Sequence, residues 1–302
     1  MTPPATGTRR RRAFREAVLA WYDAQGRVLP FRGTRDPYAV LVSEVMAQQT
    51  QIARVGERWS RFLNRFPTIR ALANARPDDV IREWRGLGYN RRAISLRRMA
   101  RVVVDEHGGS LPRDVAILQR MPGIGPYTAR AVAAIAFGMP VGAVDTNVRR
   151  VLGRAFGGAD GLSPRELQDL ADGIVPSDRA GDWTHALMDV GATFCRPRSP
   201  RCADCPARAW CAFARSPRPA FVPAAPSRGQ RRPVTFALST RWLRGRIVER
   251  LAAEPDGAWL RFDGPVGDHP SPAVADALHA LARDGLVEVD PEDPRTARLA
   301  RS

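Results

Sequence analysis

The chain has 302 residues, with 47 Lys+Arg against 31 Asp+Glu, and its formal net charge is therefore +16 at pH 7. This excess indicates a polyanionic partner, most simply nucleic acid, although a codon bias towards arginine would give the same composition. The sequence contains no lysine. Because a guanidinium stays protonated, a Schiff base on a lysine side chain is excluded, and only the N-terminal amine could replace it.

The length allows two domains, or one large and one small domain. No run of 18 or more apolar residues predicts a membrane span. The N-terminal segment is basic and has no apolar core of a signal peptide, so we expect a reducing, cytoplasmic compartment.

Apolar residues recur at helical spacing through most of the first 215 residues, and short Gly, Pro and Asp breaks separate these stretches. No alternating strand pattern occurs there, which predicts an all-α region. The expected helices are 14–22, 38–47, 55–66, 79–84, 92–104, 115–120, 127–137 and 147–156.

The last third of the chain changes character. Residues 216–238 are rich in Pro and Arg, which predicts a linker. Helices are expected at 241–253 and 272–284, strands at 258–262 and 286–289, and a polar loop at 290–296. This order predicts a small α+β module at 239–302, similar to a winged helix.

Four cysteines form the densest group of candidate ligands. Cys195, Cys202, Cys205 and Cys211 are the only cysteines of the chain and are separated by six, two and five residues. One loop could direct four thiolates to a common centre, as in an iron–sulfur cluster or a zinc site. Two disulfides, or a redox pair at the Cys-x-x-Cys, are the alternatives, and the spacing does not separate cluster from zinc.

The segment 118–132 contains a Pro-Gly-Ile-Gly turn between two apolar helical stretches. Gly123 and Gly125 would allow positive φ and leave backbone N–H groups open at the start of the next helix, which binds phosphate. The segment resembles the helix–hairpin–helix motif of DNA-binding proteins. A plain helix–helix connector is the alternative interpretation.

Glu44 lies in an apolar helical stretch and is followed by Gln48, Gln49, Thr50 and Gln51. A buried carboxyl resists ionisation, which raises its pKa and suits it to general acid catalysis. Without the polar residues one turn away, a surface glutamate would be the better interpretation.

Asp145 precedes the helical stretch 147–156. Helix capping is the ordinary role of such an aspartate. A capping carboxylate can also face a cavity, where its charge would stabilise a nearby cation.

Taken together, the hairpin, the downstream aspartate and the cysteine loop resemble the endonuclease III superfamily of DNA glycosylases, from about residue 14 to 215. Within it, the motifs around Arg32, Glu44, Tyr89 and Tyr127 resemble the MutY family of adenine DNA glycosylases. The resemblance implies a [4Fe-4S] cluster on the four cysteines. It also implies an N-terminal helix (1–30) packed on a cluster domain (141–215), and a six-helix barrel (31–140) that contains the hairpin.

The resemblance also implies roles for individual residues. Glu44 would protonate N7 of an extruded adenine, and Asp145 would stabilise the cationic sugar. Two further residues, Asn147 and Tyr127, would position the reacting groups. Arg27 and Arg32 would approach the flipped base, and Gln48 and Tyr89 would insert near its estranged partner base. The other residues expected to contact the DNA are Thr50, Gly123 and Gly125.

The sequence departs from the usual family motifs at Phe31, Ala47, Asn90 and Thr146, none of which is the proposed acid or aspartate. About 60 residues follow the predicted linker, too few for the Nudix-like domain that reads 8-oxoguanine in well-known members. Strand cleavage would resemble the family only with a lysine after the hairpin, where this chain has Tyr127.

We therefore expect a monomeric, monofunctional glycosylase that acts on double-stranded DNA with adenine opposite 8-oxoguanine or guanine. Two alternatives remain at this point. One is a glycosylase for thymine or uracil mismatches, or for oxidised pyrimidines, on the same scaffold. The other is a DNA-binding protein without catalytic activity.

Overall fold

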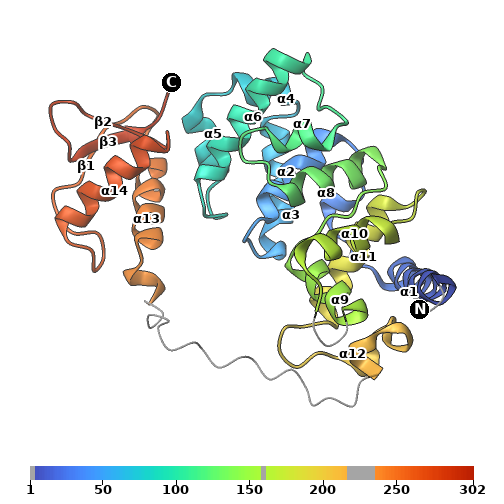
Figure 1. Cartoon of the computed structure of the whole chain (residues 1–302). Coiled ribbons are helices and arrows are strands. Elements are labelled where there is room, and N and C mark those ends of the chain that lie inside the picture. Colours follow the sequence, from blue (N-terminus) through green and yellow to red (C-terminus); the bar gives the residue numbers. More distant parts are fainter. Residues whose placement is uncertain (1–3, 158–160, 216–234) are drawn as a thin grey trace. The chain divides into compact units, whose positions relative to one another are not determined.

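The computed structural model describes residues 4–157, 161–215 and 235–302 and is mainly helical (Figure 1). Contacts between residues divide the chain into two compact units. Unit 1 contains residues 1–41, 113–120 and 124–226, and unit 2 contains residues 42–112, 121–123 and 227–302. The domain division predicted from the sequence has other borders, and it stays a prediction.

Unit 1 has a core to which five of its helices contribute buried apolar residues. Phe14 of the N-terminal helix packs edge-to-face on Phe156 and Trp183, with ring centroids 5.1 and 6.4 Å apart. The elements of this unit are α1 (Pro4–Gln25), η1 (Pro30–Arg32), α7 (Val115–Gln119), α8 (Pro126–Phe137), α9 (Thr146–Phe156), α10 (Pro164–Ile174), α11 (Ala180–Thr193), η2 (Cys202–Asp204), η3 (Arg208–Trp210) and α12 (Ala212–Arg215).

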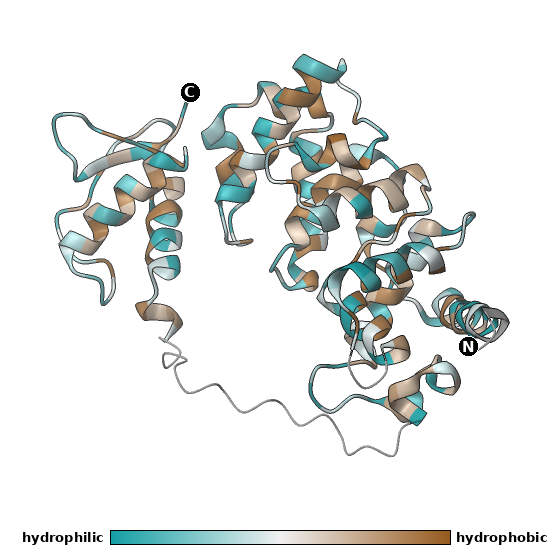
Figure 2. Ribbon diagram, in the orientation of Figure 1, coloured by the Kyte–Doolittle hydropathy of each residue, from teal (hydrophilic) through white to brown (hydrophobic). Residues whose placement is uncertain are grey.

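The helix α2 (Pro37–Ala47) begins in unit 1 and ends in unit 2. In unit 2 the chain continues through α3 (Ile52–Arg65), α4 (Ile69–Asn74), α5 (Pro77–Glu83) and α6 (Arg91–His107). Phe62 of α3 and Trp84 after α5 are fully buried, with ring centroids 5.9 Å apart. The ribbons of both units carry apolar and polar bands, as amphipathic helices around a core require (Figure 2).

The C-terminal part of unit 2 is a small α+β module. Its elements are η4 (Phe236–Leu238), α13 (Thr240–Ala253), β1 (Leu260–Arg261), α14 (Ser271–Arg283), β2 (Val287–Val289) and β3 (Thr296–Leu299). The strands form an antiparallel sheet in the order β1-β3-β2, with Leu260 opposite Ala297 and Val287 opposite Leu299. The core of this module also includes Ile81 of α5 and Ile94 of α6.

The structure confirms the predicted all-α region and the small α+β module, and adds elements that the periodicity missed. The helices α4, α10 and α11 were not predicted, and β3 begins where a polar loop was expected at 290–296. Of the predicted linker, residues 216–234 lie outside the described residues. Its last residues, 236–238, form the short helix η4.

Within the described ranges, no helix is long and apolar enough to cross a membrane.

Candidate active site and cysteine loop

Glu44 lies in the most buried stretch of α2. Its exposure is 8 %, and its neighbours Leu41, Val42 and Val45 are buried as well. The apolar setting predicted for this carboxyl is therefore confirmed. Its role as an acid stays a prediction.

Arg92 of α6 ties the end of α2 to the segment that follows it. Its Nη1 donates to the carbonyl oxygens of Val45, Met46 and Gln48 at 2.7, 3.0 and 2.6 Å. The last carbonyls of a helix have no partner within the helix, so the guanidinium satisfies acceptors that would otherwise need water. The segment that carries Gln48 and Thr50 is held in place in this way.

The same guanidinium also holds the loop between α5 and α6. Its Nη2 donates to the carbonyls of Leu87 and Gly88 at 3.2 and 3.0 Å, and to Thr50 Oγ1 at 3.0 Å. Burial lowers the pKa of Arg92 to about 10, which still leaves it charged at neutral pH. Gln48, Thr50 and Tyr89, all predicted to contact DNA, thus lie on two segments organised by one arginine that sequence reasoning did not single out.

The hairpin connects α7 and α8, which pack against each other within unit 1. Gly123 has φ +79°, and a Cβ there would lie 2.8 Å from Ser95 Cβ, so a larger residue does not fit. Gly125 was expected to allow positive φ as well, but its φ is −88°, because it is the N-cap of α8. Both glycines are exposed. Because glycine has no side chain, Gly125 does not cap the first backbone N–H groups of α8.

Asp145 caps α9. Its carboxylate accepts from the N–H of Val148 at 2.6 Å and from Asn147 Nδ2 at 2.9 Å. The capping interpretation is confirmed, and the half-buried carboxylate is also joined to the predicted positioning residue Asn147. Arg150 Nη2 continues this network, donating to Asn147 Oδ1 at 2.7 Å and to the Gly191 carbonyl at 2.8 Å.

Tyr127, in the first turn of α8, is half-buried. Its hydroxyl contacts the sulfur of Met188 on α11 at 3.3 Å. Tyr127 thus packs on the helix that also carries Asp189 and His185, two buried polar residues that the sequence analysis did not single out.

Arg27 and Arg32 converge on Asp189. Arg32 Nη1 and Nη2 donate to the two carboxylate oxygens at 2.6 and 2.7 Å, and the backbone N–H of Arg27 donates to Oδ2 at 3.0 Å. Burial alone would raise the pKa of Asp189, but the hydrogen bonds from Arg32 and Arg27 lower it. The Arg32 side chain is 8 % exposed and that of Arg27 is 35 % exposed, so only Arg27 presents much surface.

His185 lies one turn before Asp189 on α11 and is buried. Burial, followed by the charge of Arg32, lowers the pKa of His185 to about 3. The imidazole is therefore neutral at physiological pH.

The cysteine loop lies against α1 and α9 in unit 1. Arg10 of α1 donates to the Trp210 carbonyl at 2.8 Å. Arg154 of α9 donates to the Cys195 sulfur at 3.3 Å and lies 4.9 Å from the ring centroid of Phe213. The loop is therefore anchored by arginines on the helices that surround it.

All four cysteines are free and half-buried. Burial raises the pKa of the Cys202 thiol, and the neighbouring thiols of Cys211 and Cys195 raise it further. Burial likewise raises the pKa of Cys205 to about 11. The thiols thus lie within electrostatic reach of one another. No three His, Cys, Asp or Glu side chains of the described residues are grouped closely enough for one metal ion.

Within each unit, the structure brings together several of the residues predicted from the sequence. Asp145 is joined to Asn147, and Arg27 to Arg32, in unit 1. Glu44 belongs to unit 2, whereas Asp145 belongs to unit 1. The residues that sequence reasoning missed are Arg92, Arg150, Arg154 and Asp189. They are buried or half-buried polar side chains with partners far away in the chain.

Residues 42–177 match the family described as "HhH-GPD superfamily base excision DNA repair protein". An adenine DNA glycosylase of Mycobacterium tuberculosis is 41% identical over 282 residues, covering 89% of this chain and 90% of the relative. A human adenine DNA glycosylase is 44% identical over 212 residues, covering 66% of this chain and 39% of the human protein.

Among solved structures, a thermostable thymine-DNA glycosylase is similar with a TM-score of 0.64 at 31% identity, covering 68% of this chain and 97% of that chain. The helical part thus has the predicted fold of the helix–hairpin–helix DNA glycosylases. Because the mycobacterial match extends over nearly the whole of both chains, the chain belongs to the HhH-GPD superfamily of base excision DNA repair proteins, on its adenine DNA glycosylase branch.

Proposed function

We propose that the protein is a monofunctional DNA glycosylase that removes adenine mispaired with 8-oxoguanine or guanine in double-stranded DNA. The observation that carries this proposal is the 41% identity to an adenine DNA glycosylase across 89% of the chain. The thymine-DNA glycosylase shares 31% identity and covers 68% of the chain, less than the mycobacterial adenine DNA glycosylase, which favours adenine over thymine.

The proposed reaction begins with a proton. The carboxyl of Glu44, buried in α2, gives its proton to N7 of the extruded adenine, and the C1′–N9 bond breaks with its electrons moving to the base. The carboxylate of Asp145 stabilises the resulting sugar cation. Asn147 holds the Asp145 carboxylate in orientation through its 2.9 Å hydrogen bond.

Water completes the reaction in this proposal. Glu44, now ionised, accepts a proton from the water that attacks C1′, so the acid is restored and an abasic site is released. Tyr127 follows the hairpin, and the chain has no lysine side chain that could attack C1′. The strand is therefore expected to stay intact.

For the cysteine loop we propose a [4Fe-4S] cluster held by Cys195, Cys202, Cys205 and Cys211. The donor set fits, because four thiols from one loop meet within electrostatic reach. A single ion needs its ligands close together, whereas a cube binds each thiolate to a different iron. Four cysteine thiolates are the usual ligands of such a cube, as in the superfamily that the cysteine spacing resembles. When bound, the cluster would supply a rigid, redox-active link across the loop.

The test compares excision from duplexes with A:8-oxoguanine, A:G, T:G and thymine glycol. Wild-type protein should release adenine from the first two. Glu44→Gln should lower the single-turnover rate at least about 100-fold while duplex affinity stays close to wild type. The matched control is Glu57→Gln, an exposed glutamate on α3, which should leave the rate unchanged. Release of thymine in preference to adenine would refute the proposal.

Borohydride trapping during turnover tests the hydrolytic step. Little covalent protein–DNA adduct should form, because no lysine amine is present. Adduct formation at the rate of base release would identify the N-terminal amine as the nucleophile, contrary to the proposed mechanism.

A further inference from the structure

Tyr89 lies between two arginines that come from different parts of unit 2. The guanidinium carbon of Arg92, on α6, is 5.5 Å from the centroid of the Tyr89 ring. That of Arg241, in the first turn of α13, is 4.6 Å from the same centroid. Arg241 also donates a hydrogen bond to the Tyr89 hydroxyl. The C-terminal module thus contacts the side chain of one residue predicted to insert into DNA.

The contact is part of a longer stack of alternating rings and guanidinium groups. Arg92 also lies 5.3 Å from the ring of Trp84, and Arg241 lies 4.8 Å from the ring of Phe236. The order is Trp84, Arg92, Tyr89, Arg241, Phe236, and every distance is within the range in which a cation is attracted to an aromatic face. Trp84 is buried at one end, and Phe236 is 56 % exposed at the other.

The backbone around Arg241 is fixed by the module itself. The Ser239 hydroxyl donates to the Phe236 carbonyl at 2.6 Å, and His269 Nε2 lies 2.9 Å from the Ala237 carbonyl. Ser239 also caps α13. The start of α13, from which the Arg241 side chain extends, is therefore held in place by hydrogen bonds within the module.

The module is also held on the helices that flank the Tyr89 loop. Arg76, before α5, donates to both carboxylate oxygens of Asp256 at 3.0 and 2.6 Å. Arg82 donates to the Ala252 carbonyl at 2.6 Å. These hydrogen bonds, together with the apolar core that the module shares with α5 and α6, hold the module in place beside the Tyr89 loop. Arg241 is held there with it.

Tyr89 needs such support. It is 36 % exposed and has φ +47°, in the left-handed region that a tyrosine rarely adopts. An exposed ring on a loop loses rotational freedom when it inserts between bases, and a ring that is already held loses less. The hydrogen bond and the two guanidinium groups therefore restrain the same exposed side chain.

We propose that Arg241 is a positioning residue for Tyr89, through which the C-terminal module sets the ring for insertion into the duplex. The inference rests on the proposed function, because it assumes that Tyr89 inserts near the base left unpaired when the adenine is flipped out. It assigns to the module a role in arranging the DNA-contacting loop of the barrel.

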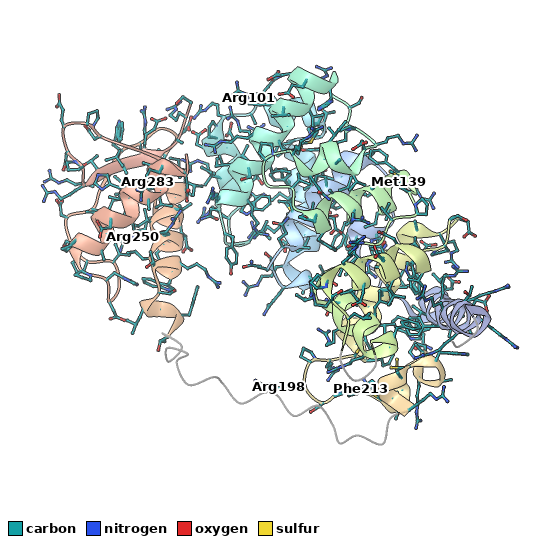
Figure 3. All side chains as sticks on the ribbon, viewed as in Figure 1. Arg101, Met139, Arg198, Phe213, Arg250 and Arg283 are labelled. Carbon is teal, nitrogen blue, oxygen red and sulfur yellow. The ribbon has the colours of Figure 1, made fainter. Side chains whose placement is uncertain are left out.

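The test is a double-mutant cycle read as affinity for an A:8-oxoguanine duplex. Arg241→Ala should lower the affinity about fivefold, the equivalent of losing one exposed cation–π contact. In a Tyr89→Ala background the same change should have no further effect. Arg241→Lys should not restore affinity, because an ammonium lacks the planar face and the fork of donors. The matched control is Arg250→Ala, an exposed arginine of the same helix (Figure 3).

Three results would overturn the proposal. An equal loss in both backgrounds would mean that Arg241 binds phosphate directly, and recovery in Arg241→Lys would mean the same. Absence of any loss in Arg241→Ala would mean that Tyr89 is positioned without it.

A second measurement needs no DNA, so it separates failure of this inference from failure of the proposed function. The chain has four tyrosines, and the signal of Tyr89 in fluorotyrosine-labelled protein can be assigned from Tyr89→Phe. Arg241→Ala should shift and broaden that ¹⁹F signal, and Arg250→Ala should leave it unchanged. An unchanged signal in both variants would refute the contact, whether or not the protein excises adenine.

Discussion

Buried His185 makes the stability of the protein depend on pH in a range where the carboxylates do not titrate. Its pKa falls from 6.5 in the unfolded chain to about 3 in the folded state, mainly through burial. Between these values the unfolded state binds more protons, so stability falls as the pH decreases below 6.5. At pH 5 the difference is 1.5 pH units, which corresponds to about 2 kcal/mol.

The assay is urea unfolding at pH 7 and at pH 5, with His185→Asn as the variant and His279→Asn, an exposed histidine, as the control. Wild type and the control should each lose about 2 kcal/mol between the two pH values, and His185→Asn should lose much less. Asp189 does not interfere, since its pKa is lowered from 3.8. An equal loss in all three proteins would show that His185 is protonated in the folded state, against the reasoning from burial.

Three further outcomes follow from the geometry. Asp189→Ala should lower the free energy of unfolding by about 3–5 kcal/mol, because it leaves the buried guanidinium of Arg32 without its partner. A loss below about 1 kcal/mol in urea unfolding would contradict this. Gly123→Ala should lower the free energy of unfolding by about 1–2 kcal/mol, because Gly123 has a positive φ. Gly125→Ala should change it by no more than about 0.5 kcal/mol, because Gly125 has a negative φ. Equal effects of the two substitutions in thermal melts would contradict the assigned conformations. Purified protein should contain about four irons per chain and lose them in Cys202→Ser, and stoichiometric zinc in anaerobically prepared protein would overturn the cluster.

Elements with one apolar face could be predicted from the sequence, and elements buried all round could not. The helix α3 buries Val55 and Phe62 and exposes its polar side, which gives a clear helical period. The helix α11 buries Trp183, His185 and Asp189 around its circumference, so polar and apolar residues alternate without a period. The helix α10 has a capping box at Ser163 and Glu166, a local signal that could have predicted it.

The candidate site shows the same limit. Glu44, Asp145 and the cysteines stand in motifs of short range, which the sequence displays directly. Asp189 is separated from Arg27 and Arg32 by 162 and 157 residues, and only folding brings the three together. Likewise, nothing in the sequence near Arg92 indicates that its guanidinium reaches the carbonyls at the end of α2, 44–47 residues away.

The apolar core that α5 and α6 share with the C-terminal module determines how a chain shortened at its C-terminal end would behave. Ile81 and Ile94 are 1 % and 4 % exposed because the module covers them. A chain that ended before the module would present both isoleucines to water, and Arg76 and Arg82 would lose their partners there, the Asp256 carboxylate and the Ala252 carbonyl. Such a truncated protein would tend to aggregate, even though every residue proposed for catalysis would still be present. The tail thus contributes to the solubility of the catalytic part of the chain.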